Sequence, residues 1–299
     1  MYLLRKENNR SIIVVGLGLI GQSIVNELIR KGYRIDRKQR VNWKESVDHI
    51  VIDILNFINE AIHENVSIIW CAGKCGFNSE DSETNIEDAF FLKIIRAIYN
   101  LLETKGEILS FYLISSIGGL FEGQVSIHDK MKPCPQRAYG RLKLSQEKTL
   151  LKSSFRLRPF IFRLSSVYGS INTNNRMGLV QVLIKNGIEN KITKIYGNAD
   201  TLRDYTSVDD ISKFICGVVI TSYDDGSNIY HLANGKASSI GEIKSLVERK
   251  IRKRLLLSYE KNATNNLNIV CCTNTYGGIW SPSFMNENIR KLYEQAINK

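Results

Sequence analysis

Tyr139 and Lys143 lie four residues apart in the segment YGRLK, and their side-chain types suit proton transfer. On a helix this spacing would put both side chains on one face. Tyrosine alone is a poor base at neutral pH, but a nearby ammonium favours its phenolate form. The pair could therefore move a proton to or from an alcohol. Ser116 or its neighbour Ser115, at the end of a strand predicted over residues 108–115, could hydrogen-bond the same substrate oxygen.

An alcohol and its ketone interconvert when a proton moves to Tyr139 and a hydride moves to a nicotinamide. The YxxxK spacing on its own carries little information. Its position gives it meaning, because it follows a serine-ended strand in a chain that opens with a glycine-rich turn.

The glycine-rich turn follows a β-branched strand predicted over residues 12–15 and precedes a helical pattern over residues 24–29. A strand, a G-x-G-x-x-G turn and a helix in this order form the dinucleotide-binding fingerprint. The glycines would allow a tight turn, the approach of the pyrophosphate and close helix packing, and the helix would offer free N–H groups to the phosphates. The predicted cofactor contacts in this segment are Gly16, Gly18, Leu19, Ile20 and Gly21.

The second predicted strand leaves the choice of dinucleotide open. The acid that grips the adenosine ribose usually lies about 20 residues beyond the glycines, whereas Asp36 lies 15 residues after Gly21. Asp36 would favour NAD, and Arg37 among its basic neighbours would clamp the 2′-phosphate of NADP. A solvated basic loop is the third interpretation, so NAD and NADP are both retained.

Two further strand ends are predicted to approach the cofactor. Residues 50–55 are typical of a third strand, and Asp53, followed by Ile54, would meet the adenine amino group or cap the next helix. Residues 66–70 predict a fourth strand. The small residues after it would let a flat cofactor lie against the backbone: Cys71, Ala72 and Gly73. We interpret Cys71 and Cys75 as packing residues and predict no metal site.

Composition limits the class of protein and its partners. The chain has 299 residues, 43% of them hydrophobic, and a net charge of +11. Its basic residues are scattered and accompany no helix-turn-helix, zinc or RNP pattern, so no nucleic acid partner is expected. No run reaches the roughly 18 apolar residues of a membrane span, and the first residues show no signal peptide. Six cysteines without a CxxC pair predict reduced thiols in a cytoplasmic protein.

The chain resembles the extended short-chain dehydrogenase/reductase family, particularly its nucleotide-sugar epimerase/dehydratase branch. The resemblance runs from Ser11 to about Ile251 and rests on five segments: GLGLIG at 16–21, the serine pair at 115–116, YGRLK at 139–143, FRLSSVYG at 162–169 and IYGNADTLRDYTSVDDI at 195–211. The last segment is the most specific, because it resembles the part of the family that holds the nucleotide of a sugar substrate.

The resemblance implies roles for individual residues. Ser116, Tyr139 and Lys143 would form the catalytic triad, with Ser116 touching substrate and the other two also touching the cofactor. Asn85 would begin the helix beside the cofactor. The strand ends would add two cofactor contacts, Ser115 and Ser166.

Arg203 would pair with the substrate phosphate, because a guanidinium can bind phosphate through two hydrogen bonds. The structural alternative is an ion pair between Arg203 and Asp204.

The implied activity is hydride transfer at a carbinol or ketone of a nucleotide-activated sugar, by a 4-epimerase or a 4-keto reductase. A 4,6-dehydratase is not expected, since Ile117 and Gly118 follow Ser116 where dehydratases of this group have Asp-Glu. A non-catalytic NAD(P)-binding sensor and a reductase of a non-nucleotide ketone are the alternatives. The resemblance also implies a homodimer.

The expected fold is α/β, a Rossmann-like doubly wound parallel sheet with a smaller C-terminal substrate lobe. Residues 1–169 would form the NAD(P)-binding domain, and residues 205–232 would return to it. Residues 170–204 and 233–299 would form the substrate-binding lobe. The active site is expected at the carboxyl ends of the strands, between the domain and the lobe.

Overall fold

A computed structural model describes residues 1–7, 10–62, 66–153, 156–170, 177–221, 226–260, 267–272, 276 and 278–298. The chain folds into two compact units. The first contains Met1–Leu120, Pro135–Arg163 and Ile215–Tyr230, and the second contains Phe121–Cys134, Leu164–Phe214 and His231–Lys299. Of the segment 205–232 that was expected to return to the cofactor domain, residues 215–230 belong to the first unit. Parts of the predicted domains lie outside the described residues: 8–9, 63–65, 154–155, 171–176, 222–225, 261–266, 273–275, 277 and 299.

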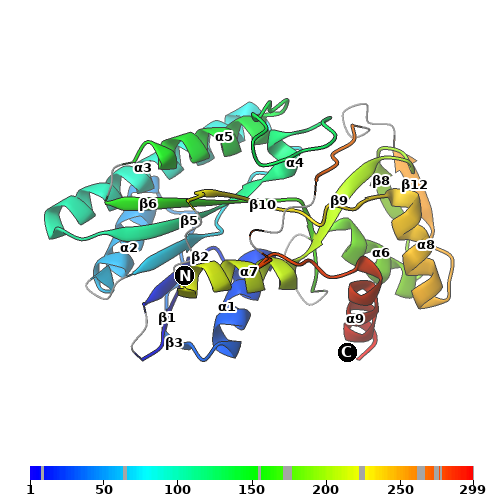
Figure 1. Cartoon of the computed structure of the whole chain (residues 1–299), viewed down its shortest axis with the longest axis horizontal. Helices are drawn as coiled ribbons and strands as arrows, with labels where there is room; N and C mark the ends of the chain where they lie inside the picture. Colours follow the sequence, from blue (N-terminus) through cyan, green and yellow to red (C-terminus); the bar gives the residue numbers. More distant parts are fainter. Residues whose placement is uncertain are drawn as a thin grey trace. The chain divides into compact units, whose positions relative to one another are not determined.

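Most of the first unit is built on a seven-stranded sheet with the order β10-β6-β5-β4-β2-β1-β3 (Figure 1). In chain order these strands are β1 (Tyr2–Arg5), β2 (Ile12–Val15), β3 (Arg34–Lys38), β4 (Ser67–Trp70), β5 (Leu109–Ser116), β6 (Leu157–Leu164) and β10 (Ile229–Leu232). Strand β2 pairs in parallel with β4, and β4 pairs in parallel with β5. The carboxyl ends of these strands therefore meet at one edge of the sheet, the carboxyl edge.

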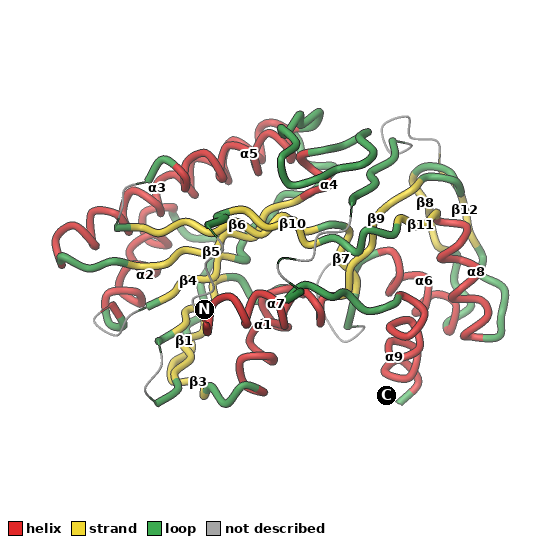
Figure 2. The backbone as a smooth tube through the Cα atoms, viewed as in Figure 1, coloured by secondary structure: helices red, strands yellow, loops and turns green. Residues whose placement is uncertain are grey.

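Helices cover both faces of this sheet (Figure 2). They are α1 (Leu19–Arg30), α2 (Val47–Asn59), α3 (Asp81–Lys105), the short α4 (Ile117–Leu120), α5 (Ala138–Leu151) and the last part of α7 (Val208–Thr221). Ile13 and Val15 of β2 join the core that contains α2 and α3. Ile12 and Val14 are also fully buried, and strand alternation points them to the opposite face. Burial on both faces explains why β2 is apolar throughout.

Strand β1 lies between β2 and β3 and is antiparallel to both. Tyr2 pairs with Val14 of β2 on one side and with Lys38 of β3 on the other. A register shift in the β1–β3 pairing leaves Asp36 as an extra residue of β3. Strand β3 consequently runs parallel to β2, but β1 lies between the two strands.

The strand predicted over residues 50–55 is wrong, because these residues lie inside helix α2. Their β-branched side chains are typical of a strand, but the apolar residues of the longer segment recur with helical spacing. The Ser46 side chain caps the helix by accepting the N–H of His49. The buried face of α2 consists of Ile50, Val51, Ile54, Phe57 and Ile58.

The helix expected to begin at Asn85 begins four residues earlier, at Asp81. A capping box explains the earlier start: the Glu80 side chain accepts a backbone N–H of the first turn, and Glu83 returns the contact to the Glu80 N–H. Asn85 therefore lies within α3, where it is exposed.

The second unit holds a three-stranded sheet, β11-β9-β7, and a parallel pair, β12-β8. Its strands are β7 (Ser166–Tyr168), β8 (Thr193–Tyr196), β9 (Leu202–Ser207), β11 (Ala237–Ser239) and β12 (Leu257–Glu260). Helices α6 (Leu179–Ile188), α8 (Ile240–Ile251) and α9 (Met285–Ile297) share one apolar core with them. The tail before α9 is anchored by Trp280, whose indole N–H donates to the Ala233 carbonyl at 2.8 Å.

Candidate active site

The glycine turn leaves open space at one of its three glycines and none at the others. Gly16 has a φ of +88°, and a Cβ there would lie 2.4 Å from the Ala72 backbone nitrogen. A Cβ at Gly21 would lie 2.0 Å from the Gly16 carbonyl oxygen. A Cβ at Gly18 would meet nothing within 4 Å. The turn thus fits the dinucleotide pattern, with tight packing at its outer glycines and an open approach at the middle one.

Helix α1 starts at this turn with Leu19 and Ile20, and its N-terminus is free to bind an anion. Gly18 is the N-cap without a side-chain cap, and the first turn carries no acidic residue. The free N–H groups and the positive helix dipole suit a pyrophosphate. The residues present therefore fit a dinucleotide cofactor.

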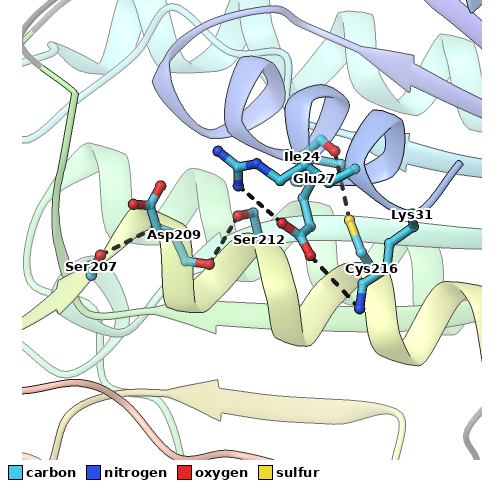
Figure 3. Close-up of polar contacts among 8 residues, drawn as sticks. Ile24, Glu27, Lys31, Ser207, Asp209, Ser212 and Cys216 are labelled. Atoms are coloured by element: carbon cyan, nitrogen blue, oxygen red, sulfur yellow. Dashed lines mark hydrogen bonds and ion pairs between the residues drawn. The ribbon is translucent and has the colours of Figure 1, made fainter. Parts of the chain in front are cut away.

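Helix α7 braces α1 from the side (Figure 3). The Cys216 thiol of α7 donates to the Ile24 carbonyl with a sulfur–oxygen distance of 3.6 Å. Glu27 lies buried on α1, where it pairs with Arg30 at 3.1 Å and with Lys31 at 4.0 Å. The Cys216 contact thus joins α7 to α1, whereas the Glu27 ion pairs lie within α1 and its C-terminal end.

The loop after β4 closes over the glycine turn. Cys71 and Ala72 line the turn, because they are the residues that a Cβ at Gly21 or Gly16 would touch. Gly73 follows, where a Cβ would lie 2.9 Å from a carboxylate oxygen of Glu87. The other oxygen of Glu87 accepts the next two backbone N–H groups of the loop, at 2.8 and 2.9 Å. Sequence reasoning missed Glu87, which fixes this loop from helix α3.

Tyr139 lies in the first turn of α5, and two glycines bring it close to the end of β5. A Cβ at Gly140 would lie 2.0 Å from the Gly119 carbonyl oxygen, so α4 and α5 touch backbone to backbone. A Cβ at Gly119 would lie 3.1 Å from the ring of Tyr139. Phe77 also packs against this ring, with a centroid distance of 5.7 Å and the two rings tilted by 37°. The tyrosine ring is therefore held in place by close backbone packing.

Lys143 is buried one turn after Tyr139, and its Nζ lies 5.8 Å from the centroid of the Tyr139 ring. The ammonium donates to the Gln146 side-chain oxygen at 3.0 Å. Burial raises the pKa of the Cys71 thiol to about 12, an effect that the charge of Lys143 opposes. Lys143 therefore lies within electrostatic reach of the loop that closes the glycine turn.

The two serines at the end of β5 have different partners. The Ser116 hydroxyl accepts the backbone N–H of Gly119 at 3.1 Å. The Ser115 hydroxyl donates to the Glu147 carboxylate at 2.6 Å. Ser115 thus faces a buried structural cluster, whereas Ser116 lies on the turn that packs against Tyr139.

That buried cluster joins Glu147 of α5 to Arg163 of β6. The guanidinium donates to both carboxylate oxygens, with distances of 2.7 to 3.2 Å. Glu147 is 1% exposed and Arg163 is 5% exposed, so the pair is a desolvated ion pair. Sequence reasoning missed both residues. The available signal was helical spacing, because Glu147 lies one further turn beyond Lys143 on the same face.

The other residues predicted near the adenosine do not lie at the glycine turn. Asp36 pairs with Arg5 at 2.6 Å, and Arg37 pairs with Glu60 and lies over the Phe57 ring. Asp53 is inside helix α2, where its neighbour Ile54 is fully buried in the apolar core. The strand end that would have placed Asp53 and Ile54 beside an adenine is therefore missing.

Ser166 and Arg203 belong to the second unit. Ser166 starts β7 and pairs with Tyr205 of β9. Arg203 donates to the backbone carbonyls of Leu202 and Leu267.

Asp204, next to Arg203, is 1% exposed and accepts the backbone N–H groups of Asn234 and Gly235 at 2.8 and 2.7 Å. Burial raises the pKa of Asp204, and those two N–H donors oppose the shift. The carboxylate therefore ties β9 to the turn that follows β10.

The described part of the chain contains no group of three or more His, Cys, Asp or Glu side chains placed to hold a metal ion. Nor does any helix in the described ranges have the length and apolar character that crossing a membrane requires.

Comparisons with known proteins bear on the family and the fold of this chain. The curated dTDP-L-rhamnose 4-epimerase of Burkholderia thailandensis is 28% identical over 123 residues, which are 40% of this chain and 34% of that protein. The matched stretch thus spans about a third of the length of that relative. The structure of MoeE5 in complex with UDP-glucose and NAD superposes with a TM-score of 0.78 at 18% identity, over 96% of this chain and 98% of that one.

The Thermus thermophilus UDP-glucose 4-epimerase in complex with NAD superposes with a TM-score of 0.75 at 16% identity, over 96% of this chain and 98% of the other. At these identities the likeness establishes the fold, and the predicted Rossmann-like α/β fold is confirmed. Residues 12–233 match the NAD dependent epimerase/dehydratase family. Because this match covers most of the chain, the protein belongs to that family, as its motifs predicted.

Proposed function

We propose that the protein transfers a hydride between a nicotinamide dinucleotide and a carbinol or ketone carbon of a nucleotide-activated sugar. The observation that carries the proposal is the buried Lys143 beside Tyr139, next to the end of β5 in a sheet that carries the glycine turn. The names of the relatives support the substrate class, since they include epimerases of dTDP- and UDP-linked sugars.

Different side chains of this chain have separate roles in the proton transfer. The Tyr139 phenolate takes the proton of the carbinol hydroxyl while the C–H bond breaks and its electron pair leaves as hydride, which forms the ketone. Lys143 stabilises the phenolate by its charge, and Gln146 holds the ammonium in place. Ser116 donates to the carbinol oxygen. A bound nicotinamide dinucleotide supplies the hydride acceptor.

Epimerisation is the first candidate for the overall reaction. Tyr139 would return the proton to the same oxygen after the ketone presents its other face to the hydride, so one bound cofactor would serve the whole cycle. A phosphate contact from Arg203 would hold the nucleotide end of the substrate during this turn. Dehydration is not part of the proposal, since Ile117 is fully buried behind Ser116 and Gly118 has no side chain.

A single-direction 4-keto reductase is the second candidate. It uses the same triad but transfers hydride once and then exchanges the cofactor. The observation in its favour is the basic segment of residues 37–44, RKQRVNWK, which carries four basic side chains and no acidic one. Basic side chains there suit a phosphorylated, exchangeable dinucleotide.

The test is a substrate panel of UDP- and dTDP-linked hexoses and 4-keto sugars, supplied with each dinucleotide and followed by chromatography of the nucleotide sugars. We expect Tyr139→Phe to lower turnover by about 100-fold to 10,000-fold, with dinucleotide affinity nearly unchanged. Tyr99→Phe is the matched control, because this half-buried tyrosine on α3 donates its hydroxyl to Glu103 and is not among the predicted site residues. Unchanged turnover in Tyr139→Phe would overturn the triad, and tight dinucleotide binding without any turnover would favour a sensor.

A further inference from the structure

The strand beside the glycine strand is the feature that departs from the dinucleotide pattern. In that pattern, the strand next to the glycine strand ends in an acid that grips the adenosine ribose. Here β1 occupies that position, and it runs in the opposite direction. The end of β1 at the carboxyl edge is Met1 and Tyr2, and neither side chain is a carboxylate.

Asp36 cannot replace the missing acid from its place on β3. Strand β3 lies two strand spacings, or about 10 Å, from β2. Asp36 is the middle residue of β3, and its carboxylate is held at 2.6 Å by Arg5, whose backbone pairs with Arg34 at the amino end of that strand. The short aspartate side chain thus lies too far from β2, and its carboxylate is already paired with Arg5.

Basic side chains surround the carboxyl edge where the acid is missing. Arg40 and Lys44 follow β3, are exposed, and have no carboxylate partner among the described residues. Lys74 follows Gly73 in the loop after β4 and donates its Nζ proton to the Trp43 carbonyl at 3.4 Å. This contact joins the segment after β3 to the loop that closes the glycine turn.

The segment after β3 is also held by an aromatic contact. Trp43 packs edge-on against Phe90 of α3 with a centroid distance of 5.9 Å. Two carboxylates lie near these basic side chains and have partners: Glu87 of α3 accepts the backbone N–H groups of Lys74 and Cys75, and Glu45 accepts the Asn42 side-chain N–H at 2.8 Å. The three basic side chains Arg40, Lys44 and Lys74 outnumber these two carboxylates, so the net charge at this place is positive.

We infer that Arg40, supported by Lys44 and Lys74, binds the adenosine ribose, and that the protein selects the 2′-phosphorylated dinucleotide. The inference rests on the proposed function for the presence of a dinucleotide. An aspartate at the ribose would repel a 2′-phosphate, and the inserted strand removes it. A long arginine side chain spans the extra strand spacing and binds phosphate with two parallel hydrogen bonds.

The test uses two ligands that differ only in the 2′-phosphate, adenosine 2′,5′-bisphosphate and adenosine 5′-monophosphate, measured by titration calorimetry at fixed ionic strength. We expect the bisphosphate to bind about tenfold or more tightly. Arg40→Ala should bring the ratio of the two affinities close to one. Arg37→Ala is the matched control, since that arginine is paired with Glu60, and it should keep the wild-type ratio.

Each other outcome has a defined meaning. A wild-type ratio of one or less overturns the inference, as does a ratio that collapses in Arg37→Ala but survives in Arg40→Ala. A ratio that rises in Asp36→Asn overturns it as well, because that acid would then face the ribose. Failure to bind either nucleotide or any dinucleotide instead overturns the cofactor of the proposed function. Thermal melts of each variant check that the fold is intact.

Discussion

The two ends of the carboxyl edge in the first unit are built in different ways. At the triad end, where β5 meets α5, Lys143 is buried and a desolvated pair of Glu147 and Arg163 lies behind it. At the ribose end, which is the segment 39–46 after β3, the basic side chains are exposed. The triad end is thus set by packing and buried charge, whereas the basic side chains of the ribose end are exposed to solvent.

This difference shows where each kind of interaction is useful. Proton transfer needs atoms held in one geometry, and buried contacts with close backbone packing supply that. Recognition of a phosphate needs charge and reach, and long exposed side chains supply both. We therefore expect substitutions at the triad end to affect stability strongly and those at the ribose end to affect it little.

The largest expected effect is that of Glu147→Gln at the triad end. The change leaves the buried Arg163 without its carboxylate, which should lower the free energy of unfolding by about 3–5 kcal/mol. Urea denaturation followed by tryptophan fluorescence measures it. The exposed Glu103→Gln on α3 is the control and should stay within about 0.5 kcal/mol of wild type.

A double variant sharpens this prediction. Glu147→Leu combined with Arg163→Met removes both charges, so most of the lost stability should return. If Glu147→Gln alone unfolds like the wild type, the buried pair does not hold the triad end together.

The next effect concerns Gly18, between the two ends. Gly18→Ala adds a methyl group in open space, so the free energy of unfolding should change by less than about 1 kcal/mol. Dinucleotide affinity should nevertheless fall by about tenfold or more, since the methyl group occupies the approach of the pyrophosphate. Calorimetric titration with the dinucleotide measures the loss. Gly217→Ala also adds a Cβ that meets nothing within 4 Å and should leave affinity unchanged, whereas full affinity in Gly18→Ala would contradict the prediction.

A smaller effect is expected for Asp36→Asn at the ribose end. Asp36 and Arg5 form a partly exposed ion pair, so the free energy of unfolding should fall by less than about 1 kcal/mol. Dinucleotide affinity should not change, because β1 separates Asp36 from the glycine strand and the carboxylate is paired with Arg5. A marked loss of NAD affinity in this variant would place Asp36 at the ribose after all.

The smallest effect is the alkylation of Cys71. A pKa raised to about 12 leaves very little thiolate below pH 9, so native Cys71 should react slowly with iodoacetamide throughout that range. The exposed Cys134 and Cys272 serve as internal controls and should be modified first. Peptide mass spectrometry measures each site, and equal rates at Cys71 and Cys134 would contradict the raised pKa of the Cys71 thiol.

Motifs that depend on near neighbours in the chain were predictable. The strand–turn–helix of residues 12–29 and the spacing of Tyr139 and Lys143 are local patterns, and the structure forms both. The strand expected over 50–55 failed because β-branched residues suit a buried helix face as well as a strand. Packing against α3 selects the helix over the strand, and no local sequence pattern contains this information.

The sequence by itself determined the glycine turn, the helical face shared by Tyr139 and Lys143, and the serines at the end of β5. Each follows from contacts within a few residues, so residue type and spacing are sufficient. Only the tertiary structure decided that β1 enters the sheet beside β2, that Asp36 pairs with Arg5, and that Glu147 meets Arg163. These features join segments distant in sequence, and their geometry depends on which strands and helices pack together.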